Sequence, residues 1–216
     1  IGDLLKEGLF QAETFQVVLA FLAEHNPSTR ALHPAGQAGS GQALTDDFLF
    51  DGEVRLNPPL RRPPKILGIG RNYPSQVGDA RPEEPIIFAK LPTAVIGPEE
   101  AILYRAGFSE LNPEAELAVV IGRQGRGLTP TEAETVIAGY SIMNDVTEVG
   151  LVRKDVPRGL PWMRSKSMDT FAPFGPCIVT PDEIGWPVAL DIELRINGRL
   201  AQSDNTGTML FSVPEL

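Results

Sequence analysis

The sequence predicts an α+β fold with a large β component. Glycine and proline contribute 21 and 20 of the 216 residues, which favours turns and short strands over long helices. From residue 65 onwards, short β-branched and apolar runs follow one another with only isolated helical patterns between them. Regular strand–helix–strand alternation is missing, so we do not expect a Rossmann or TIM-barrel architecture.

Residues 1–62 differ in pattern from the rest. Apolar residues at mostly helical spacing predict an amphipathic helix over residues 10–25. Alternation around an Asp-Gly pair predicts a small hairpin over 49–56. The Gly/Ala/Gln-rich stretch 34–43 between them predicts a loop or linker. We therefore expect a small N-terminal domain with its linker at 1–62 and a larger, strand-rich domain at 63–216.

The second domain is predicted to consist mostly of strands. The strongest candidate is 116–122, a continuous β-branched run that ends in glycine. Residues 190–198 alternate cleanly and end in Asn-Gly, the turn of a hairpin whose second strand starts at Arg199. A helix capped by Thr129 or Thr131 should run towards Ala138. Further strands are expected at 140–146 and 176–180, and short buried strands at 66–70 and 86–90.

The charge balance and the single cysteine exclude several classes of protein. The net charge of −9 repels phosphate backbones, so we expect no nucleic-acid partner, whereas a divalent cation suits such a chain. No apolar run is long enough to span a membrane, and the start of the sequence lacks a signal-peptide pattern. Cys177 alone allows neither an intramolecular disulfide nor a cysteine-based zinc site, and we expect it to be a small buried apolar residue. These features favour a cytoplasmic protein.

The positions of the histidines limit the chemistry. His25 and His33 both lie in the first 35 residues, so chemistry carried by the rest of the chain must proceed without histidine. A Ser-His-Asp hydrolase is excluded, because there is no G-x-S-x-G motif and no histidine near a late serine. The Gly68-Ile69-Gly70 sequence has Tyr73 at the third glycine position of a dinucleotide fingerprint, so nucleotide binding is not expected.

Two glutamates form the clearest candidate site. Glu114 and Glu116 precede and open a predicted strand, and their i, i+2 spacing points both carboxylates to the same side. Such a pair repels unless a cation lies between them, and Mg²⁺, Mn²⁺ or Ca²⁺ would fit; the alternative is a solvated strand edge. Asp145 leaves an apolar strand next to Asn144 and would supply a third oxygen ligand, or else cap a turn. Lys166, within Trp-Met-Arg-Ser-Lys-Ser, could bind a carboxylate or enolate oxygen, or belong to a basic surface loop.

Six collinear motifs resemble the fumarylacetoacetate hydrolase superfamily over residues 63–216. They are KILGIGRNY (65–73), IIFAK-P (86–92), EAELAVVIG (114–122), AGYSIMNDV (138–146), GLPWMRSKSMDTF (159–171) and INGRLAQSDNTGTMLFSVPEL (196–216). The resemblance implies a mixed β-sandwich roll, a homodimer and one divalent metal ion per site, Mg²⁺ or else Mn²⁺ or Ca²⁺.

The resemblance also assigns roles to individual residues. Glu114, Glu116 and Asp145 match the metal ligands, and Lys166 matches the lysine that meets the substrate's oxygens. Substrate-binding positions are matched by residues at the ends of the first two strands of this domain, namely Arg71, Asn72, Tyr73 and Lys90. Substrates of the family are 2-oxo acids and β-dicarbonyls, whose paired oxygens chelate the metal. The metal and the lysine then stabilise the enolate that develops.

The sequence departs from the family pattern in three places. Gln76 and Asp79 stand where hydrolytic members have the His–Glu pair that activates water, and an amide cannot act as a general base. Val149 stands where the family commonly has an arginine after the metal-binding aspartate. The family continues beyond the segment that ends here at Leu216, so a truncated catalytic domain is expected.

We therefore expect a metal-dependent enzyme acting on small 2-oxo acids or β-dicarbonyls, with Lys166, Gln76 and Asp79 as catalytic residues. Enol–keto isomerisation or decarboxylation is favoured over C–C hydrolysis, because these reactions tolerate a weaker proton shuttle than a histidine. The alternative is a catalytically weak or silent member that binds a metal-chelated 2-oxo acid.

Overall fold

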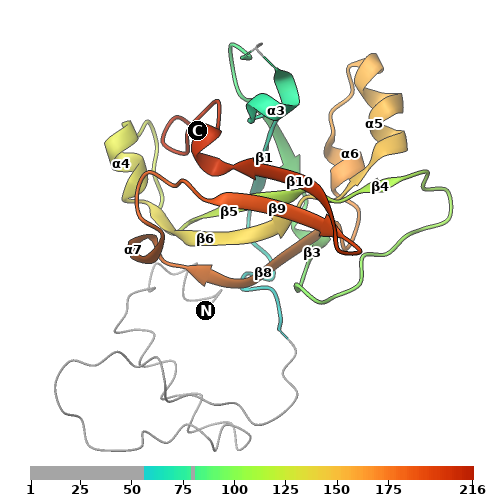
Figure 1. Ribbon diagram of the computed structural model, residues 1–216, viewed down its shortest axis with the longest axis horizontal. Helices are drawn as coiled ribbons and strands as arrows, with labels where there is room; N and C mark the ends of the chain where they lie inside the picture. Colours follow the sequence, from blue (N-terminus) through green and yellow to red (C-terminus); the bar gives the residue numbers. More distant parts are fainter. Residues whose placement is uncertain (1–55, 79–80) are drawn as a thin grey trace, which may run out of the picture.

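The computed structural model describes residues 56–78 and 81–216. The predicted helix at 10–25 and nearly all of the predicted hairpin at 49–56 lie outside these residues. The described chain forms four small sheets with short helices around them, which confirms an α+β fold with mixed sheets (Figure 1). Within the described residues, no helix is long and apolar enough to cross a membrane.

The largest sheet has four strands in the order β3-β8-β6-β5. Its members are β3 (Val95–Ile96), β8 (Ala172–Val179), β6 (Ile137–Asn144) and β5 (Ala115–Ile121). Strands β5, β6 and β8 pair antiparallel, and the short β3 pairs parallel with β8. In the described part of the chain, the long strands β5, β6 and β8 are antiparallel neighbours. This confirms that the parallel strand–helix–strand repetition of Rossmann and TIM-barrel folds is missing there.

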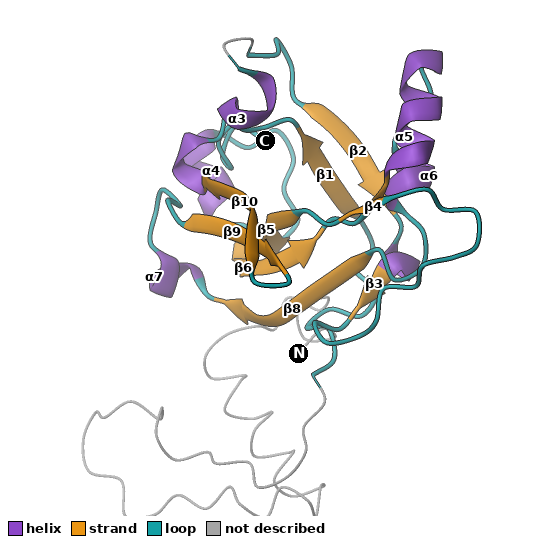
Figure 2. Ribbon diagram, turned by 45° about the vertical axis from the view of Figure 1, so that its right-hand side comes forward, coloured by secondary structure: helices purple, strands orange, loops and turns teal. Residues whose placement is uncertain are grey.

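The predicted hairpin forms β9 (Asp191–Ile196) and β10 (Arg199–Asn205). Its two turn residues have positive φ, 51° at Asn197 and 78° at Gly198, which is the conformation that an Asn-Gly type I′ turn requires. Gln202 ties the hairpin to the main sheet, because its side chain accepts from Ala115 N (3.0 Å) and donates to Ala115 O (2.8 Å). Figures 1 and 2 show β9 and β10 as a separate layer beside β5 and β6.

A second pair, β1 (Ile66–Gly70) and β2 (Ile86–Lys90), has the predicted bounds. The prediction that these strands are buried is wrong: Leu67 is 62% exposed and Ile87 is 56% exposed. A two-stranded ribbon has one face free unless another layer covers it, so apolar composition alone did not decide burial. Strands β4 (Leu111–Asn112) and β7 (Thr147–Glu148) form the remaining small antiparallel pair.

The helices are short. Helix α4 begins as predicted, with Thr129 and Glu132 forming a capping box, but it ends at Glu134 because Ile137 already opens β6. The others are α3 (Pro74–Val77), α5 (Val149–Asp155), α6 (Met163–Lys166), α7 (Pro181–Ile184) and the 3-10 turns η2 (Pro92–Ala94), η3 (Val156–Arg158) and η4 (Thr206–Thr208).

Two apolar clusters hold the layers together. The first centres on Phe171, Val146, Ala94 and Ala172, and the second on Val120 and Phe174. Val146, a member of the first apolar cluster, directly follows Asp145 in the chain. A candidate site residue therefore lies next to this cluster. Cys177 is exposed, contrary to the prediction, because its position on β8 does not face either cluster.

Candidate functional site

Pairing of β5 with β6 brings the first two candidate residues together. Ala115 lies opposite Asn144 in the register, so Glu114 and Asp145 are neighbours across the strand ends. The backbone of Asp145 donates to Glu114 O (2.9 Å), and the Asn144 amide oxygen accepts from Glu114 N (3.0 Å). Thr147 Oγ1 donates to Glu114 Oε1 at 2.7 Å, which fixes that carboxylate further.

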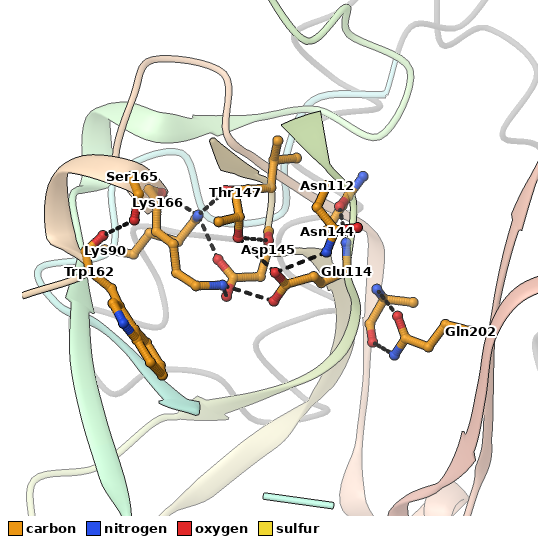
Figure 3. A network of polar contacts seen from close by, with 12 residues as sticks. Lys90, Asn112, Glu114, Asn144, Asp145, Thr147, Trp162, Ser165, Lys166 and Gln202 are labelled. Atoms are coloured by element: carbon orange, nitrogen blue, oxygen red, sulfur yellow. Dashed lines mark hydrogen bonds and ion pairs between the residues drawn. The ribbon is translucent and has the colours of Figure 1, made fainter. Parts of the chain in front are cut away.

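Two lysines converge on these carboxylates (Figure 3). Lys166 Nζ lies 2.8 Å from Glu114 Oε2 and 2.5 Å from Asp145 Oδ2. Lys90 Nζ lies 2.6 Å from Asp145 Oδ1. The lysine side chains are 2% and 7% exposed, so these ion pairs are shielded from water and from salt screening. The alternative interpretation, in which Lys166 belongs to a basic surface loop, is therefore wrong.

Lys90 is fully engaged with protein acceptors. Besides its ion pair with Asp145, it donates hydrogen bonds to Val146 O (3.3 Å) and to Lys166 O. The Lys90 ammonium therefore contacts three protein oxygens. Lys90 thus joins the end of β2 to the β6–β7 connection and to the C-terminal end of α6. Its predicted role in binding substrate stays a prediction; the contacts present are structural.

Glu116 completes what we call the carboxylate–lysine cluster: Lys90, Glu114, Glu116, Asp145 and Lys166. Within the described residues the Glu116 side chain forms no hydrogen bond or ion pair. Burial, reinforced by the negative charges of Glu114 and Asp145, raises its pKa to about 8. For Lys166, burial lowers the pKa, but Asp145 and Glu114 outweigh burial and the net shift is upward. For Lys90, burial prevails and its pKa is lowered.

The donor chemistry of the cluster fits a divalent cation. With all three carboxylates ionised, the cluster would carry one negative charge more than its two ammonium groups balance; burial and this imbalance together raise the pKa of Glu116. Hard oxygen donors of this kind are those that Mg²⁺, Mn²⁺ and Ca²⁺ prefer. In the described part of the chain, however, no three His, Cys, Asp or Glu side chains already stand in a metal-binding arrangement. Instead, Lys166 Nζ bridges Glu114 and Asp145.

Helix α6 presents Lys166 to the cluster and is itself anchored. Arg164 pairs through two guanidinium nitrogens with both carboxylate oxygens of Asp155, at the end of α5. Asp155 is 1% exposed, and the paired guanidinium holds its pKa below the usual range. Bidentate pairing of this kind fixes orientation as well as distance. The α5–α6 connection therefore sets where Lys166 stands.

The other side of the site is the Tyr73–Gln76 segment, which runs into α3. A broad cleft is lined by both this segment and the cluster. Tyr73 is buried, and burial together with the charges of Glu116 and Asp204 raises its pKa to about 12. Gln76 lies on α3, none of whose residues is buried, and its side chain is exposed. Asp79 lies outside the described residues.

The base of this segment is fastened to the end of the chain. Asn72 exchanges two side-chain hydrogen bonds with the backbone of Phe211, at 2.9 and 2.8 Å. Ser75 Oγ donates to Asp204 at 2.6 Å. Arg71 lines the cleft and has a φ of 55°, a turn conformation that leaves its side chain exposed. The predicted site residues that the structure describes therefore all line one cleft, while their roles remain predictions.

Sequence reasoning missed several supporting residues. Thr147, Asn144 and Gln202 hold Glu114 and Ala115 in place, and Asp155 anchors α6 through Arg164. Thr147 and Asn144 flank Asp145 and could have been suspected from that proximity. Gln202 and Asp155 carried no local signal, because their partners lie 87 and nine residues away in the chain.

Comparison with known proteins decides the family. The model of the fumarylacetoacetate (FAA) hydrolase C-terminal family matches residues 65–216. The chain belongs to the fumarylacetoacetate hydrolase family. Enzymes of this family are generally dependent on a divalent metal, in agreement with the oxygen donors assembled in the cluster.

Three relatives illustrate the similarity. The chain is 38% identical over 182 residues to a 2,4-didehydro-3-deoxy-L-rhamnonate hydrolase of a Sphingomonas strain, covering 83% of this chain and 63% of the relative. It is 37% identical over 171 residues to a mitochondrial oxaloacetate tautomerase of Bos taurus, covering 76% of this chain and 52% of the relative. The crystal structure of a 5-carboxymethyl-2-hydroxymuconate delta-isomerase from Mycobacterium smegmatis superposes with a TM-score of 0.66 at 36% identity, covering 74% of this chain and 60% of that one. The chain thus spans between about half and two thirds of the length of these three proteins.

Proposed function

We propose that this chain catalyses enol–keto tautomerisation of a small 2-oxo acid with the help of a divalent metal ion. The observation that carries the proposal is the carboxylate–lysine cluster, in which Lys166 contacts both Glu114 and Asp145. The similarity to a tautomerase and to an isomerase supports this reaction class. Decarboxylation of a 2-oxo acid is a second reaction that the same cluster could catalyse.

Glu114, Glu116 and Asp145 would hold the metal, Mg²⁺ first and Mn²⁺ or Ca²⁺ as alternatives. When bound, the metal supplies a Lewis acid for the paired oxygens of the substrate. With all three carboxylates ionised, the two positive charges of the metal would change the net charge of the cluster from −1 to +1. A positive net charge favours binding of a 2-oxo acid anion. Such a site can work in a chain of net charge −9 because local charges dominate in a buried place.

Lys166 is the residue proposed to stabilise developing negative charge on the substrate's oxygen. Its raised pKa keeps the amine charged through the neutral range. A preorganised cation in a partly dry cleft opposes a developing charge more strongly than water does. Lys90 and the Asp155–Arg164 pair hold Lys166 and Asp145 in position, so little reorganisation is needed during the reaction.

Proton transfer is assigned to the other side of the cleft. With a pKa of about 12, Tyr73 stays protonated at neutral pH, so it can donate a proton or a hydrogen bond but does not act as a base. Gln76 can orient a water molecule through its amide, and Asp79 is the remaining candidate for a base. Hydrolysis of a C–C bond is the less favoured reaction, because it needs a general base at the position of Gln76, and an amide cannot act as one.

The second candidate is a member that binds a metal-chelated 2-oxo acid without turnover. The observation that favours it is again Gln76, whose side chain is exposed and cannot accept a proton near neutral pH. Homodimerisation and a cytoplasmic location also stay proposals, the first from the family resemblance and the second from the sequence.

The test follows the ultraviolet absorbance of enolised 2-oxo acids, beginning with oxaloacetate and phenylpyruvate, in the presence of Mg²⁺. We expect faster loss of the enol than in buffer with Mg²⁺ alone, and no acceleration after chelation of the metal. An unaccelerated reaction with every enol, together with metal-dependent binding of oxalate, would reject the tautomerase and support the silent binder.

A further inference from the structure

Two aromatic rings stand directly beside the carboxylate–lysine cluster. The Phe88 ring centroid lies 5.0 Å from Lys166 Nζ. Trp162 packs edge to face on Phe88, with 5.5 Å between centroids and 62° between the ring planes. Both residues line the same cleft as Glu114 and Glu116. Trp162 stands one helical turn before Lys166, whose backbone N–H donates to Trp162 O (3.1 Å), and Figure 3 shows the indole ring outside the hydrogen-bonded network.

The glycines of β1 make room for these rings. A Cβ atom at Gly68 would lie 2.1 Å from the Phe88 ring, and one at Gly70 would lie 2.3 Å from the Trp162 ring. Neither distance is compatible with a side chain, so the Gly68-Ile69-Gly70 sequence serves to seat two flat rings against the backbone of β1. This accounts for a glycine pair that does not complete a dinucleotide fingerprint.

We propose that Phe88 and Trp162 form a subsite for a flat apolar substituent, aromatic or conjugated, on the 2-oxo acid. The inference rests on the proposed function, because the 2-oxo acid group must lie at the cluster for its substituent to reach the rings. Lys166 lies between the carboxylates and the proposed subsite, because its ammonium contacts Glu114 and Asp145 on one side and lies over the Phe88 ring on the other. A flat substituent would stack on or against these rings and be withdrawn from water.

The competing occupant is a second carboxylate, as in a 2-oxo diacid. A carboxylate next to the rings would lose hydration without a matching partner there, because Lys166 contacts Glu114 and Asp145 and its remaining capacity is assigned to the reacting oxygen of the 2-oxo acid group. The subsite should therefore select phenylpyruvate over oxaloacetate and over pyruvate, which has no substituent large enough to reach the rings.

Trp162 provides a direct reporter of occupancy. The chain has only two tryptophans, and the second, Trp186, lies between α7 and β9 and does not line the cleft. The variant Trp186→Phe leaves Trp162 as the sole indole. Phenylpyruvate binding should change its emission, whereas oxalate, which has the head group alone, should leave the emission nearly unchanged.

The experiment titrates the full chain with oxalate, pyruvate, oxaloacetate and phenylpyruvate in the presence of Mg²⁺, by calorimetry and by Trp162 emission in Trp186→Phe. We expect phenylpyruvate to compete with oxalate and to bind roughly tenfold or more tightly than pyruvate, from burial of the phenyl group. Phe88→Leu keeps an apolar side chain on β2 and should weaken phenylpyruvate about two- to tenfold, the range of an aromatic pair. The same variant should leave oxalate affinity within twofold.

Several results would overturn the inference. If oxalate binds but phenylpyruvate binds no more tightly than pyruvate, or oxaloacetate binds more tightly than phenylpyruvate, the apolar subsite is rejected while the proposed function stands. An unchanged Trp162 emission on saturation with phenylpyruvate rejects it as well, and this arm does not depend on the folding of Phe88→Leu. If oxalate itself fails to bind, the proposed function falls and the inference falls with it.

Discussion

The two sides of the cleft differ in how firmly they are built. In the carboxylate–lysine cluster, Lys90, Asp145 and Lys166 are buried and each has several partners. At the Tyr73–Gln76 segment, Tyr73 and the preceding Asn72 are buried, but helix α3 has no buried residue. The fold therefore fixes the charges that are proposed to meet the substrate's oxygens and leaves the proposed proton-transfer side near the surface.

This difference follows from the elements on each side. The cluster sits where β2, the β6–β7 connection and α6 converge, so each charge is held from several directions. The Tyr73–Gln76 segment is tied to the rest mainly through Asn72 and Ser75. Changes in the cluster should thus affect stability and binding strongly, and changes on α3 should affect them weakly.

The largest effect on stability is expected for Lys90→Met. Removing this buried ammonium leaves Asp145 Oδ1 and two backbone carbonyls without their partner. Breaking a buried ion pair from one side costs about 3–5 kcal/mol. Urea unfolding of Lys90→Met should show that loss, while the exposed Lys154→Met should change stability by less than about 0.5 kcal/mol. A similarly small loss in both variants would show that the cluster is not held as described.

Lys166→Met is expected to have the largest effect on turnover. Loss of one preorganised group that stabilises developing charge lowers kcat by about 10²–10³-fold. The measurement is the rate of enol loss with saturating substrate and Mg²⁺, with Lys154→Met as the matched control. A kcat within threefold of the unmodified chain would remove Lys166 from the mechanism, whatever happens to substrate affinity.

Glu116→Gln tests the charge imbalance of the cluster through the pH dependence of stability. The pKa of Glu116 is raised from 4.5 to about 8 in the folded, metal-free chain. Its contribution to stability is therefore fully present below pH 4.5 and is lost as the pH rises through 8. Glu116→Gln, which carries no charge, should match the unmodified chain near pH 4.5 and exceed it increasingly towards pH 8.5.

Melting temperatures without metal measure this difference. At a chain length of about 200 residues, each 1 kcal/mol corresponds to roughly 2–4 °C, so a difference in melting temperature of at least a few degrees is expected at pH 8.5. Added Mg²⁺ should raise the melting temperature of the unmodified chain more than that of the variant. A gap that is constant with pH would mean that Glu116 is not the group that titrates.

The smallest effect is expected for Gln76→Ala. Gln76 is exposed on α3, and its side chain forms no hydrogen bond within the described residues. Unfolding free energy should change by less than about 0.5 kcal/mol, and oxalate affinity in the presence of Mg²⁺ should stay within twofold. A large loss of either quantity would show that α3 closes on the cluster more firmly than its contacts indicate.

Much of the strand pattern could be predicted from local sequence. Strands β1 and β2 have the predicted bounds, and the Asn197-Gly198 turn located the β9–β10 hairpin because few residues adopt positive φ in succession. The end of α4 could not be predicted from local sequence. Helical propensity continues beyond Glu134, but Ile137 already pairs with β5 as the first residue of β6.

The residues that gather in the carboxylate–lysine cluster could be picked out from the sequence by type, whereas their contacts with one another could not. Paired carboxylates at i, i+2 and an aspartate leaving a strand are visible in the sequence. The contact of Lys90 with Asp145 joins residues 55 apart, and nothing local indicates that this lysine faces inward. The exposure of Cys177 was missed for the same reason, because which face of β8 is covered depends on its neighbours in the sheet.

The most direct test of the central claim is a calorimetric titration of Mn²⁺ and oxalate, on this chain and on Glu116→Ala. Oxalate reproduces the paired oxygens of a 2-oxo acid enolate. We predict that oxalate binds the unmodified chain only when Mn²⁺ is present, and that Glu116→Ala, with its fold verified by circular dichroism, loses this binding. Metal-independent oxalate binding, or equal binding to both proteins, would contradict the assignment of the cluster as a metal-assisted 2-oxo acid site.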